Sequence, residues 1–291
     1  MNIRYPFRAG TFYESESAPC RFEAERLIDS VILPQDLPSK LYGGLVPHAG
    51  WMYSGPVAAT TIAALGQSAE KIESIILLGA DHVGKAQYAE VYDSGTWRTP
   101  LGDVLIDSEI ASALIETNEL FSANPAAHER EHSLEVQIPL IQTVLPNVRI
   151  VPISVAPTDK AVDIGRHIGH TLAEHFPNVP IIGSTDLTHH GGHFPTPGGH
   201  GQIGVQWSRD NDKRMLDLIE AMNEESIIAE ANLRANACGA GPIAATVSAC
   251  RILGASKGLI LEYTNSYEVI HRMYPDDPDD TTVGYASVVF S

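Results

Sequence analysis

Histidine residues follow three segments of the sequence that we expect to be buried β-strands. His48 comes directly after the apolar run at 41–47, His82 comes three residues after the run at 74–79, and His189 follows the run at 179–183. In open α/β sheets, ligands bind beyond the carboxyl ends of the strands, so side chains at such positions meet at one edge. Neutral imidazole is the commonest metal ligand and also serves as a general acid or base. The spacing therefore predicts a shared metal or catalytic site.

Each histidine also has an ordinary structural interpretation. His48 lies close to Gly50 and could be a turn residue, and His82 could cap the segment that follows it. His189 and His190 precede two glycines and could belong to a solvated loop. We favour the common site, because scattered surface histidines would not be expected to follow three separate strands.

Three residues could add an anionic ligand to these histidines: Cys238, Asp186 and Asp81. Cys238 precedes a glycine-rich turn and an expected helix, and a helix N-terminus stabilises a thiolate. A free cysteine is more often a small buried apolar residue, an interpretation that fits Cys250 inside an apolar helix. We assign no role to Cys20.

The segment 128–132 reads His-Glu-Arg-Glu-His and matches the His-Glu-x-x-His zinc motif. In that motif both histidines lie inside one helix, whereas Ser133 here is expected to cap a helix that begins after the segment. We therefore predict a loop from which His132 reaches the site, and we disfavour a metalloprotease. The sequence Gly-Ala-Gly at 239–241 lacks the Lys-Ser/Thr ending of a nucleotide-binding loop.

Apolar runs of strand length alternate with segments of helical period, which predicts one α/β domain over residues 1–291 with a mixed, largely parallel central sheet flanked by helices. Pro139 predicts a kink in one helix, and Asp107 is placed to cap another. A long loop is expected at 191–204, with His193 and His200 inside it. We expect strands at 41–47, 74–79, 87–92, 149–155, 179–183, 258–263 and 282–290, and helices at 55–65, 107–115, 133–145, 159–176, 205–222 and 242–253.

The composition excludes several classes of function. The chain has 291 residues, 44% of them hydrophobic, with 19 Lys and Arg against 36 Asp and Glu, for a net charge of −17. Such a chain would be repelled by nucleic acid and by anionic membranes. Three cysteines form no disulfide framework, and neither a secretory signal nor a membrane span is evident. These features predict a cytoplasmic protein, and the 12 histidines are its most specific compositional feature.

Six blocks, taken in order, resemble the Memo family, also known as protein B of the AmmeMemoRadiSam system. They are RAGTFY at 8–13, VPHAGWMYSG at 46–55, LLGADH at 77–82, EHSLEVQIP at 131–139, STDLTH at 184–189 and NACGAGPI at 236–243. The resemblance spans nearly the whole chain. It implies the fold of the class III extradiol ring-cleavage dioxygenases, which use non-haem Fe(II).

The resemblance also implies roles for particular residues. It places a metal on His48, His82 and Cys238, an acid/base function on His189, and Asp186 and His132 in the lining of the pocket. The ring-cleavage enzymes have a carboxylate where this sequence has Cys238, and a softer thiolate ligand shifts metal preference toward Zn or Cu(I). The implied cofactor is a divalent metal, Fe(II) first and Cu or Zn next, and the implied partner proteins are an Amme-type domain and a radical-SAM protein.

We therefore predict a metal-binding oxidoreductase of dioxygenase type with a small substrate, in which His189 moves a proton and Asp186 holds it in orientation. One alternative is a binding or scaffold protein that captures a peptide or small molecule without turnover. Another is a metal-dependent hydrolase in which His189 or Asp186 acts as the base on a metal-bound water.

Overall fold

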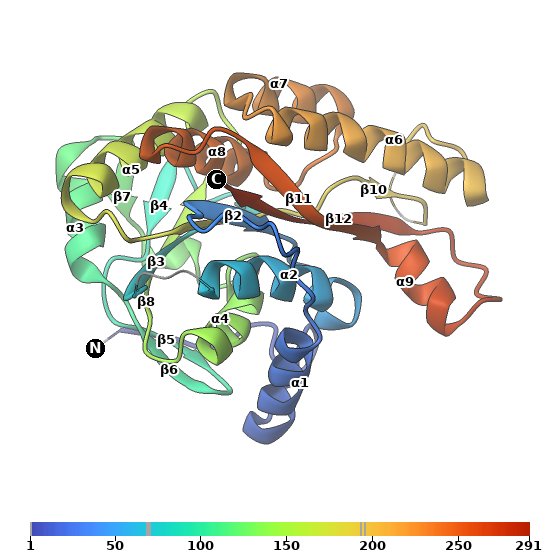
Figure 1. Cartoon of the computed structure of the whole chain (residues 1–291), viewed down its shortest axis with the longest axis horizontal. Helices are drawn as coiled ribbons and strands as arrows, with labels where there is room; N and C mark the ends of the chain where they lie inside the picture. Colours follow the sequence, from blue (N-terminus) through green and yellow to red (C-terminus); the bar gives the residue numbers. More distant parts are fainter. Residues whose placement is uncertain (1, 68–70, 193, 195) are drawn as a thin grey trace.

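Four parallel strands form the centre of the sheet that carries the site. The computed structural model describes residues 2–67, 71–192, 194 and 196–291. In it β2 (Gly43–Val46), β9 (Ile181–Ser184), β3 (Ser74–Gly79) and β8 (Arg149–Val155) lie side by side and parallel. Their carboxyl ends therefore meet at one edge, as the sequence predicts (Figure 1).

Antiparallel strands extend this parallel centre on both sides. β12 (Thr282–Phe290) pairs with β2, and β4 (Ala89–Val91) pairs with β8. Within the described residues the sheet has nine strands, in the order β10-β12-β2-β9-β3-β8-β4-β7, with β11 also paired to β12. The remaining strands are β7 (Phe121–Ala123), β10 (His189–His190) and β11 (Gly258–Asn265). The predicted mixed α/β sheet is confirmed.

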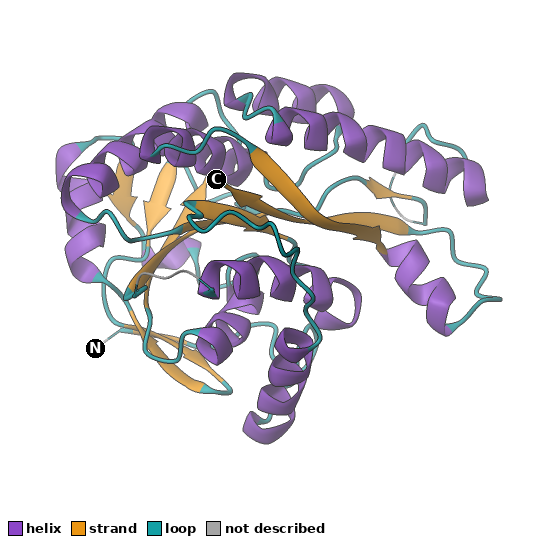
Figure 2. Cartoon of the chain, viewed as in Figure 1, coloured by secondary structure: helices purple, strands orange, loops and turns teal. Residues whose placement is uncertain are grey.

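Side chains of the central strands alternate between two cores, because successive residues of a strand point to opposite faces. Ile76 and Leu78 of β3 pack into one core and Ile75 and Leu77 into the other. Helices cover both faces, so a continuous apolar run is buried throughout (Figure 2). One core receives α3 (Ser108–Thr117), α5 (Ala161–His175), α6 (Gly201–Glu220), α7 (Glu224–Arg234) and α8 (Ala240–Leu253), and the other receives α1 (Ser17–Asp29), α2 (Trp51–Gly66) and α4 (Ile138–Val144).

Glycine allows α5 and α8 to cross closely behind the site. A Cβ on Gly165 would lie 2.2 Å from the carbonyl oxygen of Ala245, and one on Gly169 would lie 2.9 Å from that of Ala249. Larger residues at these two positions of α5 would push α8 away from the sheet. The crossing helps to hold α8, whose N-terminus follows Cys238.

Two predictions about local structure are wrong. The helix expected at 133–145 is a 3₁₀ turn, Glu135–Gln137, followed by α4, so Pro139 lies in the first turn of α4 and kinks nothing. A proline is tolerated there, because the first-turn N–H groups have no partner inside the helix. The loop expected at 191–204 ends earlier than predicted, since α6 begins at Gly201.

Other elements carry too weak a pattern to be found in the sequence. They include α1, α7 and α9 (Ser266–Met273) and a three-stranded sheet of β1 (Ile3–Arg4), β5 (Thr96–Thr99) and β6 (Gly102–Leu105), besides a 3₁₀ turn at Pro125–Ala127. The predicted cap of α3 is confirmed, because the Asp107 side chain accepts a hydrogen bond from the N–H of Ile110. In the described part of the chain, every helix is too short or too polar to cross a membrane.

Candidate metal centre

The side chains at the carboxyl edge of the sheet come from separate parts of the chain. His48 follows β2, His82 follows β3, and Asp186 and His189 follow β9. His132 comes from the loop before α4, as the sequence predicts. Cys238 lies in the turn before α8.

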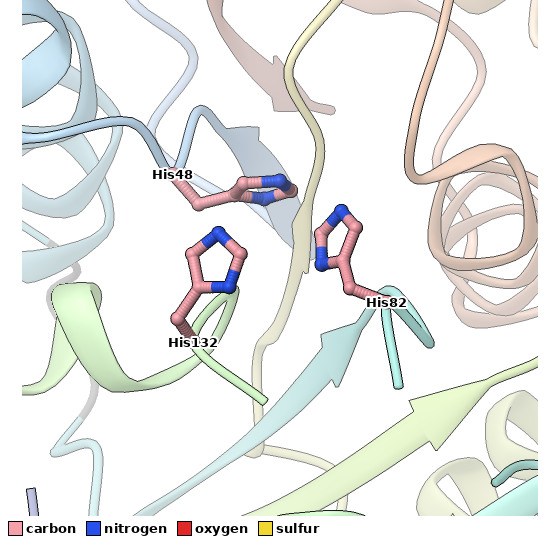
Figure 3. Close-up of side chains that lie close together, drawn as sticks. All are labelled: His48, His82 and His132. Atoms are coloured by element: carbon pink, nitrogen blue, oxygen red, sulfur yellow. The ribbon is translucent and has the colours of Figure 1, made fainter. Parts of the chain in front are cut away.

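Three of these histidines form a compact cluster. The ring centroids are 5.1 Å apart for His48 and His82, 4.8 Å for His82 and His132, and 5.5 Å for His48 and His132. One ring nitrogen from each lies within 4.8 Å of the others, and the rings converge on a common space (Figure 3). Three nitrogens at these separations could hold one metal ion.

Hydrogen bonds around His48 define its tautomer. The Ser184 hydroxyl donates to the carbonyl oxygen of Ser133 at 2.7 Å, so its oxygen accepts from Nδ1–H of His48, 2.8 Å away. Nε2 of His48 therefore carries the lone pair that a metal requires. Burial first, and then the neighbouring His82, holds the pKa of His48 well below its usual value, so its ring is neutral at pH 7.

A buried carboxylate fixes His82. Oε1 of Glu131 accepts from Nδ1–H of His82 at 2.9 Å, and Oε2 accepts from its backbone N–H at 2.7 Å. Nε2 of His82 is the nitrogen left for a ligand. Burial alone would lower the pKa of His82, but the hydrogen bond and charge of Glu131 raise it. A metal that binds Nε2 of His82 would therefore compete with a proton for that nitrogen.

The same carboxylate places His132. Oε1 of Glu131 also accepts the backbone N–H groups of His132 at 2.9 Å and Ser133 at 2.8 Å. Burial opposes ionisation of Glu131, yet the His82 hydrogen bond and charge and these backbone donors bring its pKa below the usual value. For His132, burial and the nearby His48 and His82 lower the pKa to about 3, which keeps its ring neutral.

Glu131 was not singled out in the sequence as a functional residue. Glu131 lies in a loop rich in charged residues, a composition typical of a solvated segment. No periodic pattern in the sequence distinguishes it as a buried residue. The loop is instead held by a buried cation, because Arg4 donates to the carbonyl oxygens of His128 at 3.0 Å and Glu131 at 2.7 Å. Arg4 also pairs with the buried Glu135 at 2.6 Å.

Cys238 lies beside the cluster. Its Sγ is 3.1 Å from Nε2 of His48 and 3.3 Å from the backbone nitrogen of Asp186, which donates to it. Burial, and then the charge of Asp186, raises the pKa of the Cys238 thiol, so without a metal it is protonated. The structure thus brings Cys238 next to His48, while its service as a ligand remains a prediction.

Within the described residues no hydrogen bond joins Asp186 to His189, although the charge of His189 is, after burial, the next largest influence on the pKa of Asp186. Oδ1 of Asp186 accepts the backbone N–H of His48 at 2.7 Å, and burial raises the pKa of Asp186 to about 6. His189 instead donates from Nδ1 to the carbonyl oxygen of Leu187, 2.9 Å away, so Nε2 is the ring nitrogen not used by this hydrogen bond. The backbone of Leu187, rather than Asp186, therefore orients His189.

A cavity of about 400 Å³ adjoins the cluster. His48, His132, Asp186 and His189 line it, whereas His82 and Cys238 do not. The rest of its wall comes from the N-terminal segment, the start of α2, Phe194 and the stretch from α9 to β12, which includes Asp279 and Thr281. A small molecule in this cavity would contact the cluster from one side.

The other polar residues considered in the sequence lie outside the cluster. His128 is buried and donates from Nε2 to the carbonyl oxygen of Glu90, so the His-Glu-x-x-His match has a structural explanation. Both ring nitrogens of His190 bond within the loop that follows it, and Asp81 accepts the backbone N–H groups of Lys85 and Ala86. His200 is exposed, and His193 lies outside the described residues.

Comparisons with known proteins found a family model and relatives that match nearly the whole chain. The family model described as "Memo-like protein" matches residues 4–289. A MEMO1 family protein of Methanopyrus kandleri is 35% identical over 298 residues, covering 99% of this chain and 98% of the relative. One from Methanothermobacter thermautotrophicus is 35% identical over 277 residues, covering 92% of this chain and 95% of the relative.

A solved structure is similar in fold alone. The crystal structure of an uncharacterized protein from Escherichia coli K12 matches with a TM-score of 0.50 and 11% sequence identity, covering 85% of this chain and 99% of the other. At that identity the likeness carries no information about activity.

Replacing Glu131 tests its control of the cluster. In Glu131→Gln, the amide group cannot accept on both sides, so His82 and His132 lose their common anchor. We expect metal affinity to fall about 10- to 100-fold, the usual effect of removing a group that orients a ligand. Isothermal titration with Zn²⁺ measures the change. The neighbouring exposed residue gives the control, Glu129→Gln, which should bind as the unaltered protein does. Equal affinities for all three proteins would contradict the role of Glu131.

A buried acid behind the site gives a pH-dependent prediction. Asp212 accepts from the N–H of Thr188 and from the hydroxyl of Tyr263, each at 2.7 Å, and burial raises its pKa to about 7. The folded state thus binds a proton that the unfolded state releases near pH 4, so stability falls as pH rises from about 4 to 7. Asp212→Asn should remove a component on the order of 3 kcal/mol from this fall.

Urea unfolding at several pH values measures that difference. Asp210→Asn, on the exposed side of the same helix, should keep the pH dependence of the unaltered chain. Parallel stability curves for the unaltered protein and Asp212→Asn would refute the prediction.

Proposed function

The chain belongs to the Memo-like family, and from that membership and the histidine cluster we propose that it is a non-haem metal-dependent oxidoreductase acting on a small substrate. The observation that carries the proposal is the position of the cluster. Three histidine nitrogens lie within 4.8 Å of one another beside a cavity of about 400 Å³. A metal held there would have a substrate-sized space on one side.

The donor set fits a divalent transition metal. Imidazole nitrogens suit iron, copper and zinc, and outer carboxylates that orient the rings are typical of such sites. We propose His48, His82 and His132 as ligands, with Cys238 as a further ligand once its proton is displaced. Fe(II) is the proposed metal because the Memo family is related in fold to the class III extradiol dioxygenases; the cysteine keeps copper and zinc as alternatives.

Side chains around the metal site would transfer protons and hold the ligands in position. A bound Fe(II) would supply redox chemistry with oxygen. His189 lines the cavity, and because its Nδ1–H is bound to Leu187, Nε2 is the nitrogen proposed to take a proton from a substrate hydroxyl and return it. Asp186 fixes the backbone of His48, Ser184 holds the ring of His48, and Glu131 holds the ring of His82.

A binding protein without turnover is the second candidate, favoured by the aromatic and aliphatic side chains that line much of the cavity. Such a protein would take up the metal and the ligand but consume no oxygen. A hydrolase would use the same ligands with zinc, and it too would consume no oxygen.

Anaerobic reconstitution with Fe(II), followed by oxygen consumption on a panel of catechols, tests the proposal. We expect one iron per chain and oxygen uptake with at least one catechol. The double variant His48→Ala/His82→Ala should lose the iron, because two of three ligands are gone. His189→Gln should keep the iron and lose most of the oxygen uptake, since a proton-transferring group contributes about 10²- to 10⁴-fold.

His170→Ala is the matched control, because His170 is exposed on α5 and does not line the cavity. It should resemble the unaltered protein in iron content and oxygen uptake. Iron uptake that survives in His48→Ala/His82→Ala would refute the metal site. Iron uptake without oxygen consumption on any catechol would instead favour the binding protein.

A further inference from the structure

The wall of the cavity beside the histidines has an uneven distribution of charge. Two carboxylates, Asp186 and Asp279, line it, and no lysine or arginine from the described part of the chain does so. Arg8 comes near, because its guanidinium carbon lies 4.7 Å from the ring centroid of Phe12, but Arg8 is not part of the wall. An anionic group in the cavity would find no side-chain cation away from the histidines.

The two carboxylates occupy different environments. Asp186 is buried and bonded to the backbone of His48, so it belongs to the histidine end of the cavity. Asp279 is exposed and comes from the segment between α9 and β12, which also contains Asp276, Asp277 and Asp280. The cavity therefore extends from buried histidines to an exposed, strongly acidic segment.

Local hydrogen bonds hold Asp279 in position. Its Oδ1 accepts from the backbone N–H of Thr281 at 2.9 Å and from the Thr281 hydroxyl at 2.6 Å. Within the described residues, no hydrogen bond uses Oδ2 of Asp279, so that oxygen can meet a ligand. Thr281 itself lines the cavity, which places the turn at its wall.

Aromatic rings supply the remainder of a site for an organic cation. Phe12, Tyr53, Phe194 and Tyr285 line the same cavity as the histidines and Asp279. The faces of such rings attract cations and also pack against another aromatic ring. A carboxylate with aromatic walls matches an ammonium group carried on an apolar body, and the net charge of −17 adds to the attraction.

We propose that this cavity selects a small aromatic amine, with its ring toward the histidines and its ammonium group on Asp279. The inference deepens the proposed function, since it names the substrate class of the same cavity and rests on that function for the chemistry at the ring. The preference for a cationic ligand depends on the residues of the cavity wall and does not require a bound metal.

Three matched phenols test the selection on the metal-free protein. Tyramine carries a cationic tail, 4-ethylphenol a neutral one and 4-hydroxyphenylacetate an anionic one. Isothermal titration should rank their affinities in that order. We expect about tenfold between the cation and the anion, because an exposed ion pair and a cation–π contact each contribute modestly.

Substitution of Asp279 tests the residue. Asp279→Asn keeps an oxygen for the Thr281 hydrogen bonds and removes only the charge, so tyramine should bind about two- to fivefold more weakly while 4-ethylphenol is unchanged. Asp279→Lys should bring the anion above the cation. Asp276→Asn is the control, because Asp276 lies in the same acidic segment but does not line the cavity.

Several results would overturn the proposal. They are equal affinities for the three phenols, a preference for the anion, no saturable tyramine binding at millimolar concentrations, or a cation preference that Asp279→Asn leaves intact. Iron content of the same preparations is measured separately. Loss of iron binding with the tyramine preference intact would refute the proposed function alone, whereas iron uptake and oxygen consumption without that preference would refute this inference alone.

Discussion

The buried carboxylate of Glu131 accepts four N–H groups, and the geometry of the site depends on it. Two donors belong to His82, and the others are the backbone N–H groups of His132 and Ser133. A buried anion with that many donors is held far more firmly than an exposed one, because its hydrogen bonds are charge-assisted and shielded from water. One side chain thereby fixes the ring and tautomer of His82 and the backbone that carries His132.

Strand pairing in the sheet determines the position of the third ring, that of His48. Parallel pairing of β2, β9 and β3 brings His48 and Ser184 to the same edge as His82. Ser184 then bridges His48 and the carbonyl oxygen of Ser133, so the third ring is tied to the loop that carries Glu131. The loop is in turn fixed by Arg4, whose own charge is met by buried Glu135. Metal binding is thus linked to the N-terminal segment, although that segment supplies no ligand.

The central strands and the histidines at their ends could be predicted because both signals are local. Strands buried on both faces read as continuous apolar runs, and β3 and β8 match their predicted ranges at both ends. Glu131 and the small sheet of β1, β5 and β6 could not be predicted, because their order comes from contacts with distant residues. For the same reason, the hydrogen bond of His189 to Leu187 is a detail of backbone geometry that no sequence pattern reports.

The proposed centre requires that His48, His82 and His132 bind one metal ion together, His48 and His82 through Nε2. A crystal structure of the metal-loaded protein, with anomalous diffraction recorded at the absorption edge of the metal, tests this most directly. We predict a single anomalous peak about 2.0–2.2 Å from one ring nitrogen of each of the three histidines, Nε2 in His48 and His82, with Glu131 still bound to Nδ1 of His82. A peak away from these three histidines would contradict the proposed ligand set. So would a metal bound by His48, His82 and Cys238 but not by His132.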